Sequence, residues 1–227
     1  MRRCGGSGRA TPLRSSRSST AGRPASGSTT RRSAFHSLNL LARLHGATPA
    51  VAAIANNTGL TLPGSEHLEA GLRELDTSWS EGPFSESARE ALAENAAHVV
   101  ELLAEADRLA AEVHGRGAAH VITHGEPHAG NVMHAGSSRL LVDWDTVSLA
   151  PPERDLWLVI ETPEDADAYT DATGRAVDAA AIAFFRLTWD LKDLAEYLKL
   201  LRAPHVESDD TRRALTGVVS CVTGAER

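Results

Sequence analysis

The sequence has few cysteines and no long apolar run, and both absences exclude classes of protein. Its 227 residues include two cysteines, Cys4 and Cys221, at opposite ends of the chain. This spacing excludes a disulfide framework and a cysteine-based zinc motif. No stretch approaches the ~18 consecutive apolar residues of a membrane span, and the N-terminus lacks the apolar run of a secretory signal. We therefore expect a cytoplasmic protein with no membrane partner.

Acidic residues are absent from the first 65 positions. That segment holds nine arginines, whereas the rest of the chain holds all 30 acidic residues against 14 basic ones. A negatively charged body repels the phosphate backbone of DNA and RNA, so nucleic acid is excluded as a partner of the folded part. The same charge suits cationic small molecules.

Large apolar side chains are scarce at the start of the chain. Arginine, serine, glycine and threonine dominate residues 1–33, and Leu13 is the only leucine, isoleucine or valine before Leu38. Such a composition cannot offset the entropy lost on ordering. The sequence predicts a disordered leader over residues 1–33 and a folded domain over residues 34–227.

Apolar periodicity predicts a mostly α (α+β) fold for that domain. Leucines and other apolar residues recur at helical spacing, and a helix is also expected to begin after Pro151 and Pro152. The predicted helices cover residues 35–45, 65–76, 86–114, 177–202 and 209–222. Ser87 and Glu90 fit a capping box at the start of the third. In the middle of the chain the period changes to two, and "HVIT", "NVMHA" and "RLLVDW" are predicted to be short strands, the last two forming a hairpin.

The stretch "HGEPHAGN", residues 124–131, lies between the first two of these strands. Phosphoryl transfer requires a carboxylate that accepts the proton of the attacking hydroxyl, together with an amide oxygen and a second carboxylate that hold magnesium. Glu126, Asn131 and Asp143 supply these groups in that order. Because a hairpin brings the ends of its strands together, we expect the three side chains to share one site.

Two other interpretations of this stretch stay open. His124 and His128 could bind zinc in a metal-dependent hydrolase, although Pro127 and the neighbouring glycines break the helix that would direct both imidazoles at one ion. The stretch could also be an ordinary polar turn, since Asp, Asn and Gly are common turn residues.

The segments "ITHGEPHAGNVM" and "LLVDWDTVSLAPPERDLW" resemble the catalytic core of the aminoglycoside phosphotransferase and choline kinase family. The resemblance is strongest over residues 119–158 and greatest to the subgroup that includes spectinomycin phosphotransferase. It implies the C-terminal helical lobe of a protein-kinase-like fold with an embedded catalytic-loop hairpin. It also implies transfer of the γ-phosphate of ATP, with Mg²⁺, to a hydroxyl of a small cationic metabolite or of an antibiotic, as in antibiotic resistance.

The resemblance also implies roles for single residues. Glu126 occupies the position of the catalytic base, and His124 that of the histidine that orders the catalytic loop. Asn131 and Asp143 occupy the magnesium-ligand positions and would thereby bind the nucleotide. Three further carboxylates are expected behind these residues or beside the acceptor: Asp145, Asp155 as an anchor of the loop, and Asp190 on the 177–202 helix.

The sequence departs from the family in two respects. Glu126 stands where the family usually has aspartate, and the extra methylene moves the carboxylate by roughly 1 Å. Family members also carry a strand-rich nucleotide lobe with a lysine ahead of the first helix, whereas the two lysines of this chain, Lys192 and Lys199, lie in a C-terminal helix. We therefore expect a catalytic lobe alone, with little or no transfer, and the leading alternative is a non-catalytic binding protein.

Overall fold

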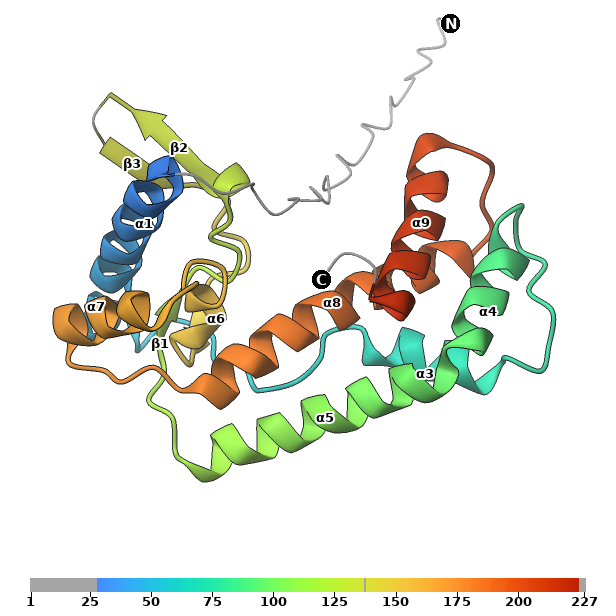
Figure 1. The fold of residues 1–227 in the computed structure, drawn as a ribbon, viewed down its shortest axis with the longest axis horizontal. Coiled ribbons are helices and arrows are strands. Elements are labelled where there is room, and N and C mark those ends of the chain that lie inside the picture. Colours follow the sequence, from blue (N-terminus) through green and yellow to red (C-terminus); the bar gives the residue numbers. More distant parts are fainter. Residues whose placement is uncertain (1–27, 137, 225–227) are drawn as a thin grey trace, which may run out of the picture.

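The structure is a computed structural model that describes residues 28–136 and 138–224, with side chains from residue 37 (Figure 1). The elements in chain order are α1 (Ser28–Gly46), α2 (Thr48–Val51), α3 (Ser65–Arg73), α4 (Ser85–Glu94), α5 (Ala96–Gly115), β1 (Val121–Thr123), a 3₁₀ turn η1 (Ala129–Asn131), β2 (Val132–Ala135), β3 (Ser138–Leu141), β4 (Ser148–Ala150), α6 (Glu153–Leu156), α7 (Pro163–Thr173), α8 (Ala179–Leu201) and α9 (Asp209–Thr223). Within these described ranges, no helix is both long and apolar enough to cross a lipid bilayer.

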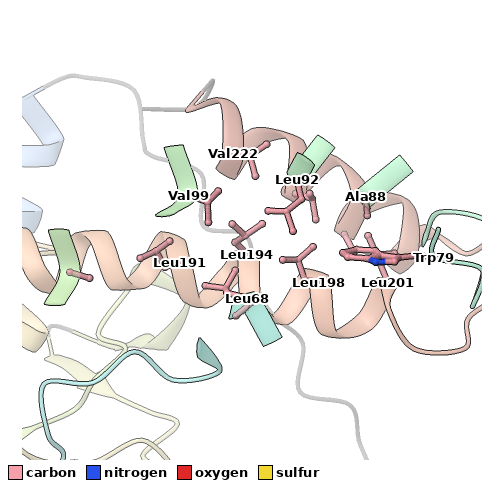
Figure 2. Close-up of a cluster of buried hydrophobic side chains, with 14 residues drawn as sticks. Leu68, Trp79, Ala88, Leu92, Val99, Leu191, Leu194, Leu198, Leu201 and Val222 are labelled. Carbon is pink, nitrogen blue, oxygen red and sulfur yellow. The ribbon is translucent and has the colours of Figure 1, made fainter. Parts of the chain in front are cut away.

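The helices form two groups. The larger group, which we call the helical body, consists of α3, α4, α5, α8 and α9, with α8 at its centre. Helices α3, α5 and α9 pack along α8, and α4 joins α9 at the far end (Figure 1). Figure 2 shows side chains from these helices meeting in one apolar cluster. Its fully buried members include Leu68, Leu92, Val99, Leu194 and Leu198. Burying one such side chain stabilises the fold by about 1.5 to 3 kcal/mol, so this cluster holds the body together.

The smaller group, which we call the loop region, consists of α1, α6, α7 and strands β1 to β4. Helix α1 packs against α7 and β1. Strand β1 pairs antiparallel with β4, and β2 pairs antiparallel with β3 to form the hairpin. A second apolar cluster seals this region, with Leu38, Leu41, Leu156 and Tyr169 almost fully buried. The connection from β1 to β2, residues 124–131, is thereby fixed at the centre of this group.

The predicted helical architecture with an embedded hairpin is confirmed, with corrections at three boundaries. The predicted helix over residues 86–114 is two helices, α4 and α5, which separate at Asn95. The Asn95 side chain donates a hydrogen bond to the carbonyl of Ala91 at 2.9 Å, a local bond of the kind that competes with helix continuation. The predicted capping box of Ser87 and Glu90 is also wrong, because α4 begins at Ser85 with no side-chain cap.

The predicted strand "RLLVDW" ends at Leu141, earlier than expected. Asp143 has a backbone φ of +67°, in the left-handed region that no strand residue adopts. The chain turns there and returns as β4, which the sequence pattern did not predict. Helix α7 was missed as well, although Thr162, Pro163 and Asp165 carry a clear start signal, a capping box with proline in the first turn.

The first helix begins earlier than predicted. α1 starts at Ser28, so the expected boundary between residues 33 and 34 falls inside a helix. Residues 1–27 of the predicted leader lie outside the described residues.

Candidate active site

One buried carboxylate, that of Asp155, binds the backbone at the start of the loop of residues 124–131. Asp155, on α6, is fully buried and accepts hydrogen bonds from the backbone amides of His124 at 2.8 Å and Gly125 at 2.6 Å. Charge-assisted bonds of this kind are about twice as strong as neutral ones. The loop therefore takes its position from a helix that follows it by about 30 residues in the chain.

The same carboxylate is tied to α1 and α7. The Nε2 atom of His45, on α1, lies 3.1 Å from Asp155, and its Nδ1 lies 2.8 Å from the hydroxyl of Tyr169 on α7. All three side chains are at most 1% exposed. Burial raises the pKa of Tyr169 to about 12, so its hydroxyl stays protonated at neutral pH. This Asp155–His45–Tyr169 chain connects the loop of residues 124–131 to α1 and α7.

His124 has both ring nitrogens engaged within the loop region. Its Nε2 lies 2.9 Å from the carbonyl oxygen of Val142, and its Nδ1 lies 3.4 Å from the backbone amide of Glu126. The ring also meets the edge of Trp144, with 4.9 Å between centroids. Because Nε2 must donate to a carbonyl, neither nitrogen is left for a metal.

The zinc interpretation therefore finds no support in the geometry. The Nδ1 atom of His128 accepts the amide of Gly130 at 3.1 Å, which shapes the start of η1. Across residues 28–136 and 138–224, no three His, Cys, Asp or Glu side chains gather in an arrangement that could hold a metal ion.

Arg154, next to Asp155 in sequence, donates hydrogen bonds to the segments that flank the loop. Its guanidinium donates to the hydroxyls of Thr123 and Ser148 at 2.8 and 2.9 Å, and to the carbonyl of Thr146 at 3.0 Å. A Cβ placed on Gly125 would lie 2.4 Å from that guanidinium, and Gly125 has a φ of +96°. The glycine is therefore required both for the backbone turn and for the close approach of Arg154.

Asn131 is hydrogen-bonded to the backbone of Glu126 and of the residue that precedes Asp143. Its Nδ2 donates to the backbone carbonyl of Glu126 at 2.9 Å, and its own carbonyl accepts the amide of Val142, the residue before Asp143, at 2.9 Å. With its nitrogen committed to Glu126, the amide oxygen of Asn131 is the atom left to bind a cation. Asp143 is exposed to solvent and held in its left-handed conformation at the end of the hairpin. Backbone strain of this kind is common at functional sites.

Glu126 meets a lysine from the helical body. Its Oε1 lies 2.8 Å from the Nζ of Lys192 on α8, and the two side chains are 27% and 36% exposed. The ammonium also lies 5.3 Å from the ring centroid of Trp189, and Trp189 contacts Trp157 with 5.3 Å between ring centroids. This ion pair is thus one of the contacts between the loop of residues 124–131 and α8.

The acidic face of α8 continues from this pair. Burial raises the pKa of Asp193 to about 6, Lys192 opposes the rise, and the carboxylates of Asp190, Glu126 and Glu196 add to it. Asp190 is half-buried on the same helix. Asp145, in contrast, is exposed in the turn that leads to β4. Of the three further carboxylates predicted, Asp155 therefore binds the backbone of the loop, and Asp190 lies on α8, where it acts on Asp193 as Glu126 does.

Sequence reasoning missed four residues of this arrangement: His45, Tyr169, Arg154 and Lys192. The position of His45 could have indicated its role. It lies on the apolar face of the first helix, and a buried histidine needs a hydrogen-bond partner. Tyr169, Arg154 and Lys192 had no such signal, since their contacts depend on how the chain folds back on itself.

Apolar side chains are exposed on the hairpin beside the site. Met133, Leu140 and Trp144 are 52%, 49% and 44% exposed. A hollow of about 330 Å³ lies between this hairpin and α1, and Leu40, Arg43 and Trp144 are among its lining residues. Contiguous exposed apolar surface is typical of a contact site.

Comparison with known proteins agrees with the resemblance carried by the loop. The model of the phosphotransferase enzyme family matches residues 12–205. The chain belongs to this family. The chain is also 30% identical to protein StrN of Streptomyces griseus over 132 residues, which cover 57% of this chain and 39% of StrN.

Two solved structures share its fold. A crystal structure of spectinomycin phosphotransferase, APH(9)-Ia, in complex with ADP and spectinomycin aligns with a TM-score of 0.65 at 18% identity. The AMP-bound complex of that protein aligns with a TM-score of 0.61, also at 18% identity. Each alignment covers 86% of this chain, and 65% and 67% of the respective solved chains. The chain thus spans about two fifths of StrN and about two thirds of the solved proteins.

Proposed function

We propose that this phosphotransferase moves the γ-phosphate of ATP to a hydroxyl group of a small, amine-bearing acceptor. The observation that carries the proposal is the coupling of Glu126, Asn131 and the Asp143 turn through Asn131, whose side-chain amide and backbone carbonyl tie all three segments together. A general base and the ligands of a hard cation belong within one rigid unit, because phosphoryl transfer depends on positioning more than on covalent chemistry.

In the proposed reaction the acceptor oxygen forms a bond to the γ-phosphorus. The bond between that phosphorus and the β,γ-bridging oxygen breaks, and ADP leaves with the electron pair. The hydroxyl proton passes to the carboxylate of Glu126. His124 and Asp155 keep the loop in place through the backbone contacts described above, and neither exchanges a proton with the acceptor.

Asn131 and Asp143 would hold Mg²⁺. An amide oxygen and a carboxylate are the donors that this cation prefers, and the exposure of Asp143 leaves room for the several waters that Mg²⁺ retains. When bound, the ion neutralises charge on the triphosphate. In calorimetric titration we expect Mg²⁺ to strengthen ATP binding, and Asp143→Ala to abolish that gain while Asp145→Ala keeps it.

The acceptor class follows from charge. Asp190, Asp193 and Glu196 lie on α8, the carboxylates of Asp190, Glu196 and Glu126 all act on Asp193, and the chain after residue 65 is strongly acidic. Ammonium groups of an acceptor would pair with them. A cationic metabolite and an aminoglycoside-type antibiotic both fit, and the spectinomycin complex of APH(9)-Ia supports the second. A cytoplasmic location, where ATP is abundant, is part of this proposal.

We further propose that transfer depends on a nucleotide lobe seated on the exposed hairpin. Among the described residues each of the two sheets has two strands, and both lysines lie on α8, so the described part offers no strand lysine for the phosphates. The apolar side chains of Met133, Leu140 and Trp144 would meet that lobe.

The test compares the 227-residue chain with the same chain fused behind the nucleotide lobe of a relative. Transfer of labelled phosphate from ATP is measured with a panel of aminocyclitols and amino alcohols. If the fusion transfers phosphate at least ten times faster than the 227-residue chain, the result supports both the proposed transfer and its dependence on a nucleotide lobe. Equal transfer in both would overturn the dependence on the lobe. Acceptor binding without transfer in either form would favour a non-catalytic binding protein.

A further inference from the structure

Lys192 is the feature of the site that the family resemblance does not explain. Its ammonium contacts Glu126 across 66 positions of sequence and joins α8 to the catalytic loop at 2.8 Å. A half-exposed ion pair contributes little to stability, so this contact is not needed to hold the fold together. Its position at the base points to a role in the chemistry.

The ammonium is fixed from two sides. Lys192 lies three positions after Trp189 on α8, and its Nζ sits over the indole ring at 5.3 Å from the centroid. The Trp189 ring packs in turn against Trp157, which directly follows α6. A lysine held against an aromatic face loses much of its usual freedom. It can therefore act as a fixed partner for the Glu126 carboxylate.

Glu126 needs such a partner more than an aspartate would. Its side chain has one more rotatable bond, and free rotation would spread the carboxylate over several positions. A base displaced by roughly 1 Å can cost about 100-fold in rate. The ion pair engages Oε1, while Oε2 has no hydrogen-bond partner within the described ranges.

We propose that Lys192 is a positioning residue for Glu126: it binds one carboxylate oxygen and directs the other to the acceptor hydroxyl. The inference rests on the proposed function for its consequence, although the ion pair itself is independent of turnover. Lys192 thereby compensates for the longer side chain at the base position.

The first arm of the test needs no turnover. The chain has two lysines, so a sample with ¹³C at lysine Cε gives two lysine signals, which Lys192→Met and Lys199→Met assign. In Glu126→Gln we expect the Lys192 signal to move and the Lys199 signal to stay. Lys199 pairs with Glu196 on the surface and serves as the matched control. An unmoved Lys192 signal would overturn the proposal.

The second arm separates positioning from binding, in whichever form of the protein transfers phosphate. We expect Lys192→Met to lower kcat about 10- to 100-fold with less than about a threefold change in either KM. Lys192→Arg should recover part of the rate, and Lys199→Met should match the wild type. An unchanged kcat, or a change confined to the acceptor KM, would overturn the proposal. If wild-type protein transfers no phosphate in any form, the proposed function fails, and the first arm alone decides whether Lys192 holds Glu126.

Discussion

The helical body and the loop of residues 124–131 are held in place by different contacts. In the body, α8 and its neighbours bury a continuous cluster of leucines, valines and alanines around Leu194 and Leu198. In the loop region, the carboxylate, imidazole and hydroxyl of Asp155, His45 and Tyr169 are just as deeply buried. Apolar burial fixes the body without direction, whereas hydrogen bonds fix the loop at defined atoms.

This difference explains how one fold can combine an apolar core that tolerates change with a loop held at defined atoms. The body tolerates changes of shape that preserve volume, because apolar contacts are not directional. The loop cannot tolerate the loss of a partner, because each buried polar group left unpaired costs more than the bond contributed. Substitutions in the two regions should therefore differ in size and in where their effects appear.

The largest effect is expected for Asp155→Ala. Two backbone amides and His45 would lose their acceptor in a buried site, at a cost of about 3 to 5 kcal/mol in unfolding free energy. Urea denaturation measures the loss, with the exposed Asp145→Ala as a control that should stay within about 0.5 kcal/mol of the wild type. A loss below about 1 kcal/mol for Asp155→Ala would show that the loop does not depend on this carboxylate.

Leu194→Ala should cost about 3 kcal/mol by leaving a cavity in the body. We expect this destabilisation to be confined to the helical body and to leave the loop of residues 124–131 closed. Under native conditions we expect hydrogen exchange at the Gly125 amide to accelerate in Asp155→Ala much more than in Leu194→Ala. Equal acceleration in both variants would mean that the two regions open as one unit, and the comparison would fail.

Asp193→Asn tests the face where the two regions meet. Burial raises the pKa of Asp193 in the folded protein from its ordinary 3.8 to about 6. Between these values the folded state holds the proton more tightly than the unfolded chain, so stability falls as pH rises through this window and stays lower above it. Asparagine should remove that fall and add about 1 to 2 kcal/mol at pH 7, since a tenfold change in proton affinity is worth about 1.4 kcal/mol and solvent screens part of it.

The pH dependence itself provides the check on this prediction. Unfolding free energies of the wild type and Asp193→Asn should converge near pH 4 and separate toward pH 7. Parallel curves would show that Asp193 does not titrate in this window.

The smallest effect is expected for Tyr169→Phe. It removes the hydroxyl that bonds to His45 but keeps the apolar ring, and one such bond is worth about 1 kcal/mol. Thermal unfolding of Tyr169→Phe and Asp155→Ala shows which end of the Asp155–His45–Tyr169 hydrogen-bond chain contributes more to stability. A loss as large as that of Asp155→Ala would place the anchor of the loop at Tyr169 instead.

Sequence alone predicted those parts of the fold that depend on local pattern. The apolar stripe of α8 is long and regular, and its predicted range of residues 177–202 falls close to Ala179–Leu201. The loop stretch identified the family because Glu126, Asn131 and Asp143 are close enough in sequence to form a motif. What those residues do stays a prediction.

The remaining features depend on contacts distant in sequence. The chain turns at Asp143 because of a backbone conformation that sequence periodicity does not report, and the return of β4 to β1 follows from it. The pairing of Lys192 with Glu126 needs α8 to cross the loop at one register. No local pattern around Lys192 indicates that partner.

The proposed reaction requires Glu126 to accept the proton of the acceptor hydroxyl. The most direct measurement is kcat for transfer from ATP by the wild type and by Glu126→Gln, in the form of the protein that turns over, with nucleotide and acceptor affinities measured alongside. General-base catalysis is worth about 100- to 10,000-fold, so we predict a loss in kcat of at least about 100-fold, with affinities within about threefold of the wild type. An unchanged kcat in Glu126→Gln would show that Glu126 is not the general base.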